Sequence, residues 1–372
     1  ITSLVTGGSL LSVILGFVLG KLSQKARPKV LCAVCGAAYV LSTASLCLCP
    51  NLGAFSVLLV VALATSNVWG FNLVPLLIAN WFPTKKGTVQ GLVSMGIPLG
   101  AGFAAMIYSQ VMGINGPLMA FMPFAFIGIL ALVVMVFGVT DYPEQSALAP
   151  DTLERIERTE CVARKDDLAR QDAEAVKGSP LGNARFVLMT LVMGIQLIFS
   201  GGLMVQIVPR LLEVGFSLDE GVACMLLSAL FACIGSFVCG VIGDRFGSRA
   251  GTMLTYAIGA LGIVLNLTGV KPLVLVSLGL IGVVVGSADN WPVNVCMDYF
   301  GRDGFARAFG AMAPLIQLVG SCGPAMFALV AGATGSYFAS YAACGALMLA
   351  GLLLFALLTR GGFGTKAVST ND

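Results

Sequence analysis

Continuous apolar runs of about 20 residues, each long enough for a helix to cross the hydrocarbon core of a bilayer, recur along most of the chain. Shorter polar segments separate these runs. We predict eleven membrane-spanning helices at residues 1–20, 30–50, 53–79, 87–112, 116–140, 184–209, 218–242, 250–268, 272–298, 305–332 and 335–359. The pattern therefore indicates an all-α polytopic membrane protein.

The composition supports the same class and excludes others. The chain is 58% hydrophobic and 10% charged, whereas a soluble domain is about a quarter charged. A net charge of +3 is too small to suggest nucleic-acid binding. Histidine is absent, which removes the commonest metal ligand and any histidine proton relay. We predict no metal and no cofactor, and we interpret Cys32 and Cys35 as small buried side chains because their CxxC pair lies inside an apolar run.

Basic residues gather on one side of the predicted helices. Nineteen of the 21 Lys and Arg residues lie in connections of one side, and only Arg210 and Lys271 lie on the other. The positive-inside rule places that basic side in the cytosol. We predict an N-terminal transmembrane bundle at 1–140, a cytosolic linker at 141–183, a C-terminal transmembrane bundle at 184–360 and a cytosolic tail at 361–372. Because eleven spans leave residue 1 outside, we expect a first helix to be missing, and we count it as helix one below.

The linker is the only long polar segment. Asp151 followed by Glu154 is typical of a helix N-terminus with a capping box. Acidic and basic residues four positions apart then indicate an amphipathic helix. We interpret it as a solvated connection between two bundles, with a regulatory or partner-binding role as the alternative.

An internal repeat of about 220 residues relates the two halves of the chain, as in transporters built from two similar bundles. The segment from Gly16 to Arg27 lies 224 positions before a similar segment that begins at Gly240. Ser66, Trp69 and Asn72 recur 221 or 222 positions later as Ser287, Trp291 and Asn294, and Asn67 corresponds to Asp289. The repeat predicts two bundles related by pseudo-twofold symmetry.

The segment Gly240–Arg249, GVIGDRFGSR, carries the most specific motif. Its motif residues are Gly240, Asp244, Arg245, Gly247 and Arg249. It resembles the Gly-x-x-x-Asp-Arg-x-Gly-x-Arg signature of the major facilitator superfamily. The resemblance implies a fold of two six-helix bundles, in which the glycines permit a tight helix-to-loop turn and the charged pair locks neighbouring helices at the cytosolic face.

Asp298, at the end of the tenth helix, adds a second acid near this motif, whereas the first half has Gly20 and Asn80 at the corresponding places. We predict a conformational latch that consists of Gly240, Asp244, Arg245, Gly247, Arg249 and Asp298. It would stabilise one conformation without touching the substrate.

Asp289 is the one charged residue well inside a predicted span. A buried aspartate costs about 2.5–3.5 kcal/mol on insertion scales, so it indicates a function. We leave two roles open: a protonation site that couples transport to a proton gradient, or a structural acid bonded to a neighbouring helix. At 100° per residue, Asp289 points away from the stripe formed by Ser287, Asn290, Trp291 and Asn294.

We predict that this polar stripe, rather than Asp289, lines the substrate path. In the resembled family the first, fourth, seventh and tenth helices line it. The candidate substrate-binding residues are therefore Trp69, Asn72, Gln196, Gln206, Arg210, Asn290, Trp291 and Asn294. Arginine is suited to bidentate carboxylate recognition, and the alternative for Arg210 is an interfacial residue that faces water.

The segment Asn80–Gly87, NWFPTKKG, precedes a glycine-rich fifth helix. It is similar to the oxalate/formate antiporter and monocarboxylate-transporter branch of the superfamily. This resemblance implies a small organic anion, a carboxylate, as the substrate.

The sequence shows no Walker motif and no catalytic constellation, so we predict neither an enzyme nor an ATP-driven pump. We expect a secondary active transporter of the plasma membrane that moves a small-molecule carboxylate by alternating access, as an antiporter or proton symporter, and that acts as a monomer in the lipid bilayer. The alternatives are a proton-coupled exporter of amphipathic compounds that uses Asp289, and a transporter-like sensor that binds without flux.

Overall fold

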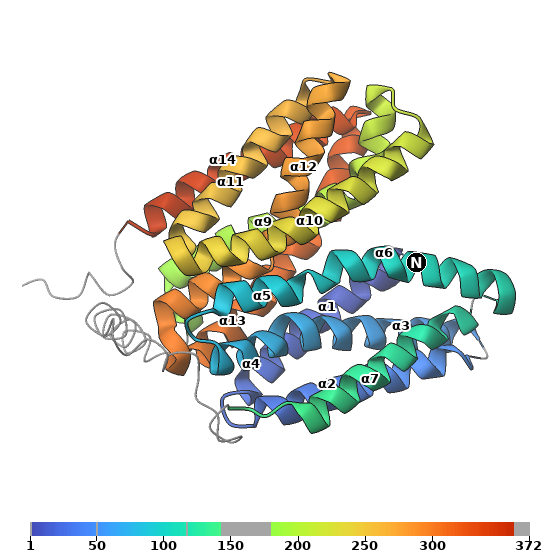
Figure 1. The fold of residues 1–372 in the computed structure, drawn as a ribbon, viewed down its shortest axis with the longest axis vertical. Coiled ribbons are helices and arrows are strands. Elements are labelled where there is room, and N and C mark those ends of the chain that lie inside the picture. Colours follow the sequence, from blue (N-terminus) through green and yellow to red (C-terminus); the bar gives the residue numbers. More distant parts are fainter. Residues whose placement is uncertain (1, 50, 117, 143–179, 361–372) are drawn as a thin grey trace, which may run out of the picture. The chain divides into compact units, whose positions relative to one another are not determined.

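The computed structural model describes residues 2–49, 51–116, 118–142 and 180–360, and every regular element in these ranges is helical (Figure 1). The first half contains α1 (Thr2–Leu22), α2 (Pro28–Leu46), α3 (Leu52–Asn67), the π-helix η1 (Val68–Leu73), α4 (Val74–Trp81), α5 (Lys86–Ser94), α6 (Gly96–Asn115), the 3-10 helix η2 (Met119–Phe121) and α7 (Met122–Gly138). The second half contains the 3-10 helix η5 (Pro180–Gly182), α9 (Ala184–Val214), α10 (Leu218–Phe246), α11 (Ser248–Leu267), α12 (Lys271–Ser287), α13 (Asn290–Thr334) and α14 (Tyr337–Leu358). The predicted linker helix with Asp151 and Glu154, and the predicted tail at 361–372, lie outside the described residues.

In the part of the chain that the structure describes, eight helices are long and apolar enough to cross a membrane. Two shorter apolar helices, Gly7–Leu22 and Lys271–Ser287, accompany them. The 45-residue α13 contains a non-helical residue, Gly301, with φ of 63°, so it consists of two helical segments. An all-helical membrane protein is therefore confirmed, and the count of eleven spans and the missing first helix stay predictions.

The chain forms two compact units. Unit 1 comprises Ile1–Pro83, Gly100–Glu154 and Phe305–Pro314, and unit 2 comprises Thr84–Leu99, Arg155–Gly304 and Leu315–Asp372. The short helix α5, which we assigned to the N-terminal bundle, thus belongs to unit 2. The two units are defined by which residues pack together, whereas the predicted bundles are continuous stretches of the sequence. This division therefore does not test the predicted domain boundaries.

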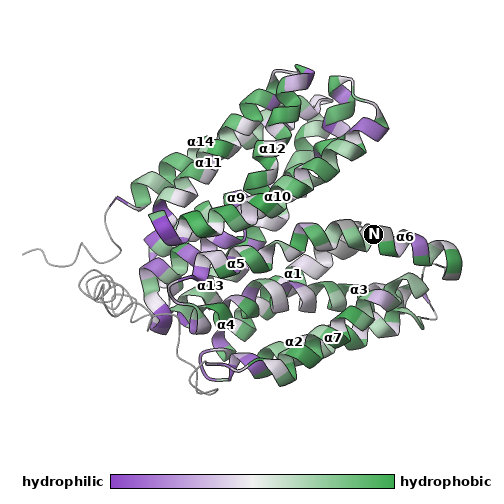
Figure 2. Cartoon of the chain, in the orientation of Figure 1, coloured by the Kyte–Doolittle hydropathy of each residue, from purple (hydrophilic) through white to green (hydrophobic). Residues whose placement is uncertain are grey.

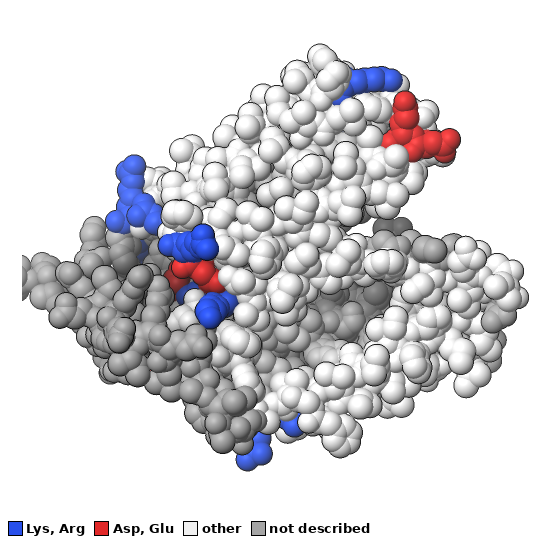
Figure 3. All heavy atoms as spheres, viewed as in Figure 1, with Lys and Arg blue, Asp and Glu red and all other residues white. Residues whose placement is uncertain are grey.

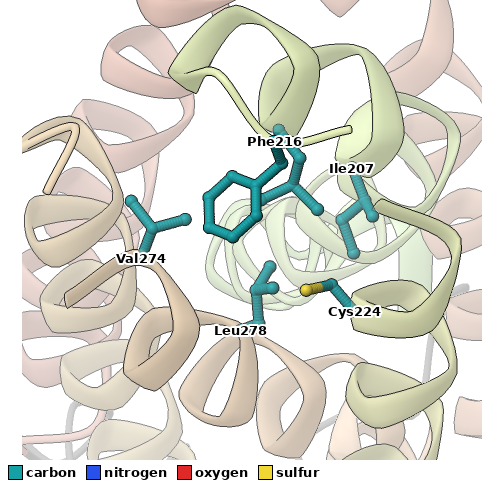
Figure 4. Close-up of a cluster of buried hydrophobic side chains, with 6 residues drawn as sticks. Ile207, Phe216, Cys224, Val274 and Leu278 are labelled. Carbon is teal, nitrogen blue, oxygen red and sulfur yellow. The ribbon is translucent and has the colours of Figure 1, made fainter. Parts of the chain in front are cut away.

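Within unit 1, α1 and α2 pack against α3, and α2 also packs against α7. Within unit 2, α10 packs against α12 and α5, α11 against α12 and α14, and α14 against α9. Glycine permits the closest contacts: a Cβ on Gly286 of α12 would lie 1.8 Å from the carbonyl oxygen of Ala232 of α10. Figure 4 shows a hydrophobic cluster of unit 2 in which Ile207, Phe216, Cys224, Val274 and Leu278 converge from α9, α10, α12 and their connections.

Local signals explain where several helices begin and end. Asn183 caps α9 by accepting hydrogen bonds from the backbone of Arg185 and Phe186. Ser217 and Glu220 form a reciprocal capping box at the start of α10. Gly215 ends α9 and Gly335 ends α13. Both adopt the left-handed backbone conformation, which glycine reaches without strain.

Hydropathy follows the same helices. Figure 2 shows apolar residues along most helices and hydrophilic residues mainly near their ends. In the face drawn in Figure 3, charged side chains occupy only a few places and the rest of the described surface is uncharged. This distribution is that of an integral membrane protein, whose lipid-facing surface must be apolar.

Candidate functional site

The best-defined polar site of unit 2 lies at the start of α5. Asp244, near the end of α10, accepts hydrogen bonds from the backbone N–H groups of Gly87 (2.8 Å) and Thr88 (2.7 Å) and from the Thr88 hydroxyl (2.7 Å). The first N–H groups of a helix have no partner within the helix, and they carry the positive end of its dipole. A carboxylate there both satisfies these donors and gains from the dipole.

A second carboxylate reaches the same turn from α13. Asp298 forms an ion pair with Lys86, and it also accepts a hydrogen bond from the backbone of Ser248 at 3.0 Å. Ser248 is the first residue of α11, whose N-cap, Gly247, has no side chain to supply a cap. Asp298 therefore holds the start of α11 as well as α5. We call Asp244 and Asp298, together with Lys86, Gly87 and Thr88, the α5 clamp.

Close helix packing brings α5 to the clamp. A Cβ on Gly240 would lie 2.2 Å from the Gly87 carbonyl oxygen, and a Cβ on Gly91 would lie 2.5 Å from the Ser236 carbonyl oxygen. The Ser236 hydroxyl donates a hydrogen bond of 2.8 Å to the Gly91 carbonyl. Only glycine at these positions lets the two backbones approach this closely.

The structure changes the membership of the predicted latch. Gly240, Asp244 and Asp298 do lie at the contact between helices, but Arg245 and Arg249 are exposed. Neither arginine bonds to Asp244 or Asp298 among the described residues, because both carboxylates are used by helix N-termini and Lys86. Sequence reasoning missed Lys86 and Thr88. The signal was present in the Lys-Lys-Gly-Thr sequence that opens α5.

In unit 1, other contacts occur at the positions that correspond to the α5 clamp. Gly20, which replaces the acid, packs against Gly310, and a Cβ there would lie 2.3 Å from the Gly310 carbonyl oxygen. Asp141, which lies in the segment that follows α7, accepts a hydrogen bond of 2.7 Å from the backbone of Lys29 and so caps α2, as Asp298 caps α11. Asn80 donates to the Asp141 carbonyl. The sequence did not predict this role of Asp141. The internal repeat could not reveal it, because Asp141 follows α7 and Asp298 lies in α13, and these two helices do not correspond in the repeat.

The predicted stripe of the second half is buried. Asn290, Trp291 and Asn294 each have no exposed surface. Asn290 donates to the Ser236 carbonyl at 2.8 Å, and the Trp291 ring lies where Gly251 of α11 leaves room. The Asn294 amide nitrogen lies 3.0 Å from the position of a Cβ on Gly87. Within unit 2 the stripe thus faces α10, α11 and α5, and its role in substrate binding stays a prediction.

The corresponding residues of the first half also face neighbouring helices. The Trp69 ring lies 6.5 Å from the Tyr39 ring of α2, and Gly36 leaves space for it. Asn72 is 5% exposed and lies against Gly16 of α1. Neither polar atom of the Asn72 side chain has a hydrogen-bond partner among the described residues.

The three candidates of α9 are buried on that helix. Gln196 is fully buried, and both polar atoms of its side chain lack a partner among the described residues. Gln206 is also buried, with its side-chain oxygen unpaired in the same part of the structure. A fixed amide with free donors and acceptors can bind a polar solute or water, so both residues keep their predicted role as a proposal.

Arg210 is neither exposed nor free. Its Nε donates to Asn266 Oδ1 at 3.0 Å, its Nη2 to the Asn266 carbonyl at 3.2 Å, and its Nη1 to Glu213 at 2.7 Å. The rings of Phe338 and Tyr341 lie 5.6 and 5.8 Å from the guanidinium carbon. This network joins α9 to α11 and α14, and the predicted alternative of an arginine facing water is wrong.

Asp289 lies in the turn between α12 and α13, and the residue as a whole is of intermediate exposure. No described residue forms a hydrogen bond with its carboxylate, so the structure offers no support for the structural acid that we left open. No group of three or more Cys, Asp or Glu residues that could hold a metal ion occurs in the described ranges.

A family model and several solved structures match this chain. The family model described as Major Facilitator Superfamily matches residues 1–324. The structure of the human organic anion transporter MFSD10 (TETRAN) is similar, with a TM-score of 0.73 and 17% identity over 95% of this chain and 83% of that one. So is the E. coli fucose:proton symporter FucP, with a TM-score of 0.70 and 14% identity over 96% and 91% of the two chains.

The proton:xylose symporter XylE, bound to 6-bromo-6-deoxy-D-glucose, is similar with a TM-score of 0.72 and 14% identity over 95% of this chain and 85% of that one. At these identities the likeness shows a common fold alone. No curated protein sequence matches the chain.

Proposed function

The chain belongs to the major facilitator superfamily, and we propose that it is a secondary active transporter that moves a small organic anion, a carboxylate, by alternating access. The observation that carries the mechanism is the α5 clamp. It consists of hydrogen bonds and an ion pair around a close contact between the glycine backbones of α5 and α10. Such a contact can open and close without the loss of a hydrophobic core, and we propose that it stabilises one conformation of the transport cycle.

The carboxylate substrate rests on two observations. The segment NWFPTKKG resembles the branch of the family that carries small organic anions. Arg210 already binds a carboxylate, that of Glu213, whose side chain is 31% exposed. A substrate that used Arg210 would have to displace Glu213, whereas the unpaired side-chain atoms of Asn72, Gln196 and Gln206 have no partner to displace among the described residues.

Asp289 supports a second candidate, a proton-coupled exporter of amphipathic compounds. An acidic residue without a partner among the described residues, inside a predicted membrane span, suits reversible protonation. A transporter-like sensor remains the third candidate, and it differs from both carriers because it predicts binding without flux.

One experiment separates these candidates. The purified protein in proteoliposomes is loaded with labelled small mono- and dicarboxylates, and exchange against external anions is followed with and without a pH gradient. Saturable exchange without the gradient supports the anion carrier. Flux that needs the gradient, and that Asp289→Asn abolishes while the matched change Asp303→Asn at an exposed acid does not, supports proton coupling. Absence of carboxylate flux would favour the exporter of amphipathic compounds, and saturable carboxylate binding without flux would favour the sensor.

We further propose a monomer in the plasma membrane with the 141–183 linker and the C-terminus in the cytosol. The placement of nineteen of the 21 basic residues supports this orientation. Cys161, within the linker, provides a test. A membrane-impermeant thiol reagent should label Cys161 in cells only after permeabilisation, and labelling of intact cells would reverse the proposed orientation.

A further inference from the structure

Asn294 of α13 is a buried amide beside the α5 clamp. The residue has no exposed surface, and neither polar atom of its side chain forms a hydrogen bond with a residue that the structure describes. One helical turn earlier on the same face, Asn290 donates to the Ser236 carbonyl of α10 at 2.8 Å. A buried amide without partners gives up the hydrogen bonds that water would provide. A conformation that supplies a partner to Asn294 is therefore favoured at this residue over the one described here.

The Asn294 amide and the Asp244 carboxylate approach the same point. A Cβ on Gly87 would lie 3.0 Å from Asn294 Nδ2 and 2.8 Å from Asp244 Oδ1. The amide nitrogen also lies 2.8 Å from the Cβ position of Gly243, the residue that precedes Asp244. Because both of these residues are glycine, neither places a side chain between the amide and the carboxylate. A hydrogen-bond donor and a charged acceptor thus lie close together without a bond between them.

In this structure the Asp244 carboxylate is bound by α5. Among the described residues, every hydrogen bond to it comes from Gly87 or Thr88. When α5 moves away from α10, the carboxylate loses all three donors at once. An ionised carboxylate without donors at a half-buried position is unfavourable, and a donor that reaches it forms a charge-assisted hydrogen bond. Opening of the clamp therefore requires a new donor for Asp244.

The two arginines of the motif are less suited to supply this donor. Arg245 and Arg249 are exposed, and neither bonds to Asp244 in the part of the chain that the structure describes. Each side chain would have to leave water, and an ion pair that remains open to water contributes little. The Asn294 amide is already buried beside the carboxylate, so little further side-chain entropy is lost when it forms the bond.

We infer that Asn294 is a positioning residue of the transport cycle, which donates a hydrogen bond from Nδ2 to the Asp244 carboxylate when the α5 clamp opens. One conformation bonds the carboxylate to α5 and the other bonds it to α13, so neither leaves the acid without a donor. This exchange brings the free energies of the two conformations closer together. In this role Asn294 does not touch the substrate. The inference rests on the proposed opening of the clamp and not on the identity of the substrate.

The rate at which the clamp opens can be followed with a single reactive thiol in the purified protein. Cys47, Cys49 and Cys322, which are not fully buried, and Cys161, outside the described residues, are first replaced by serine. Ser236 is fully buried and bonds to the Gly91 carbonyl of α5. Ser236→Cys therefore reports opening by its rate of reaction with a small thiol reagent.

A double-mutant cycle then tests the bond between Asn294 and Asp244. Asn294→Leu should slow the reaction of Ser236→Cys about tenfold, because the open conformation loses one hydrogen bond to a charged group. The same change should have little effect once Asp244→Ala has removed the acceptor. Asp298→Asn weakens the clamp but keeps Asp244, so Asn294→Leu should slow the reaction in that background too.

Thr252→Val is the matched control, because it removes a fully buried hydroxyl of α11 that also lacks a partner among the described residues. It should leave the rate unchanged. Equal slowing by Asn294→Leu with and without Asp244 would mean that the amide meets only water on opening, and this result would overturn the inference. An unchanged rate in Asn294→Leu, or a Ser236→Cys thiol that stays unreactive in every variant, would overturn it as well. Carboxylate flux is measured separately in proteoliposomes: its absence contradicts the proposed function, and the cycle still decides the role of Asn294.

Discussion

Asp244 and Thr88, from α10 and α5, are joined by two hydrogen bonds to a single carboxylate oxygen. Asp244 Oδ2 accepts from the backbone N–H and from the hydroxyl of Thr88, each at 2.7 Å. The two residues are 156 positions apart, so this contact ties a helix of the first half of the sequence to a helix of the second half. Charge-assisted hydrogen bonds of this kind are about twice as strong as neutral ones.

Asp244→Asn should weaken the α5 clamp. Loss of an N-terminal cap costs about 1 kcal/mol, which raises the population with α5 released from α10 roughly fivefold. A cysteine at Ser236, buried in the α5–α10 contact, reports this release by its rate of reaction with a thiol reagent. Ser236→Cys should react faster when combined with Asp244→Asn. Asp219→Asn, at an exposed acid in the first turn of α10, should leave the rate unchanged.

Asp298→Asn should have a smaller effect. The side chains of Lys86 and Asp298 are 11% and 28% exposed, and ion pairs with access to water contribute about 0–1 kcal/mol that salt screens. Asparagine can still accept the hydrogen bond from Ser248. We expect Asp298→Asn to lower the melting temperature slightly at low salt and not at high salt. Lys86→Gln should have the same effect, because it removes the other partner of the ion pair. An effect as large as that of Asp244→Asn at high salt would contradict this ranking.

Gly240→Ala should separate α5 from α10. The added methyl group would lie 2.2 Å from the Gly87 carbonyl oxygen, which is backbone and cannot rotate away. Overpacking of this kind costs about 1–3 kcal/mol, so we expect a lower melting temperature of the purified protein. Gly100→Ala in α6, with no atom within 4 Å of the added Cβ, is the matched control. A fall in melting temperature for both variants would point to helix propensity or lipid contact instead.

Arg210→Met should destabilise unit 2. The change leaves Asn266 with an unpaired side-chain oxygen in a buried place, which costs about 1–3 kcal/mol. Glu213 is partly exposed and keeps its bond to Ser336. A structural role predicts a lower melting temperature and yield with an unchanged KM for carboxylate exchange, whereas substrate binding by Arg210 predicts a raised KM. Lys271 is the other basic residue on the side predicted to face away from the cytosol. Lys271→Met should change neither the melting temperature nor the KM.

The helices were predictable because their signal is local. The predicted ranges 184–209, 218–242 and 250–268 fall on α9, α10 and α11, since a continuous apolar run of that length can satisfy its backbone in a bilayer only as a helix. The importance of Asp244 was also predictable, because an acid flanked by glycines at a helix end belongs to a recognisable motif. Its partners were not, because Gly87 and Thr88 are distant in sequence.

The sequence by itself determined the class of the protein, the positions of its helices, the repeat and the family. Which face of a helix packs and which stays open was decided only by the tertiary structure. A spacing rule places Trp69 and Asn72 together and Asp289 opposite Asn294, but it cannot tell which side meets a neighbour. That choice depends on glycines of other helices, such as Gly36 and Gly251, that admit a ring, and on the π-helix that changes the register after Asn67. These are properties of contacts between distant segments, and no local pattern contains them.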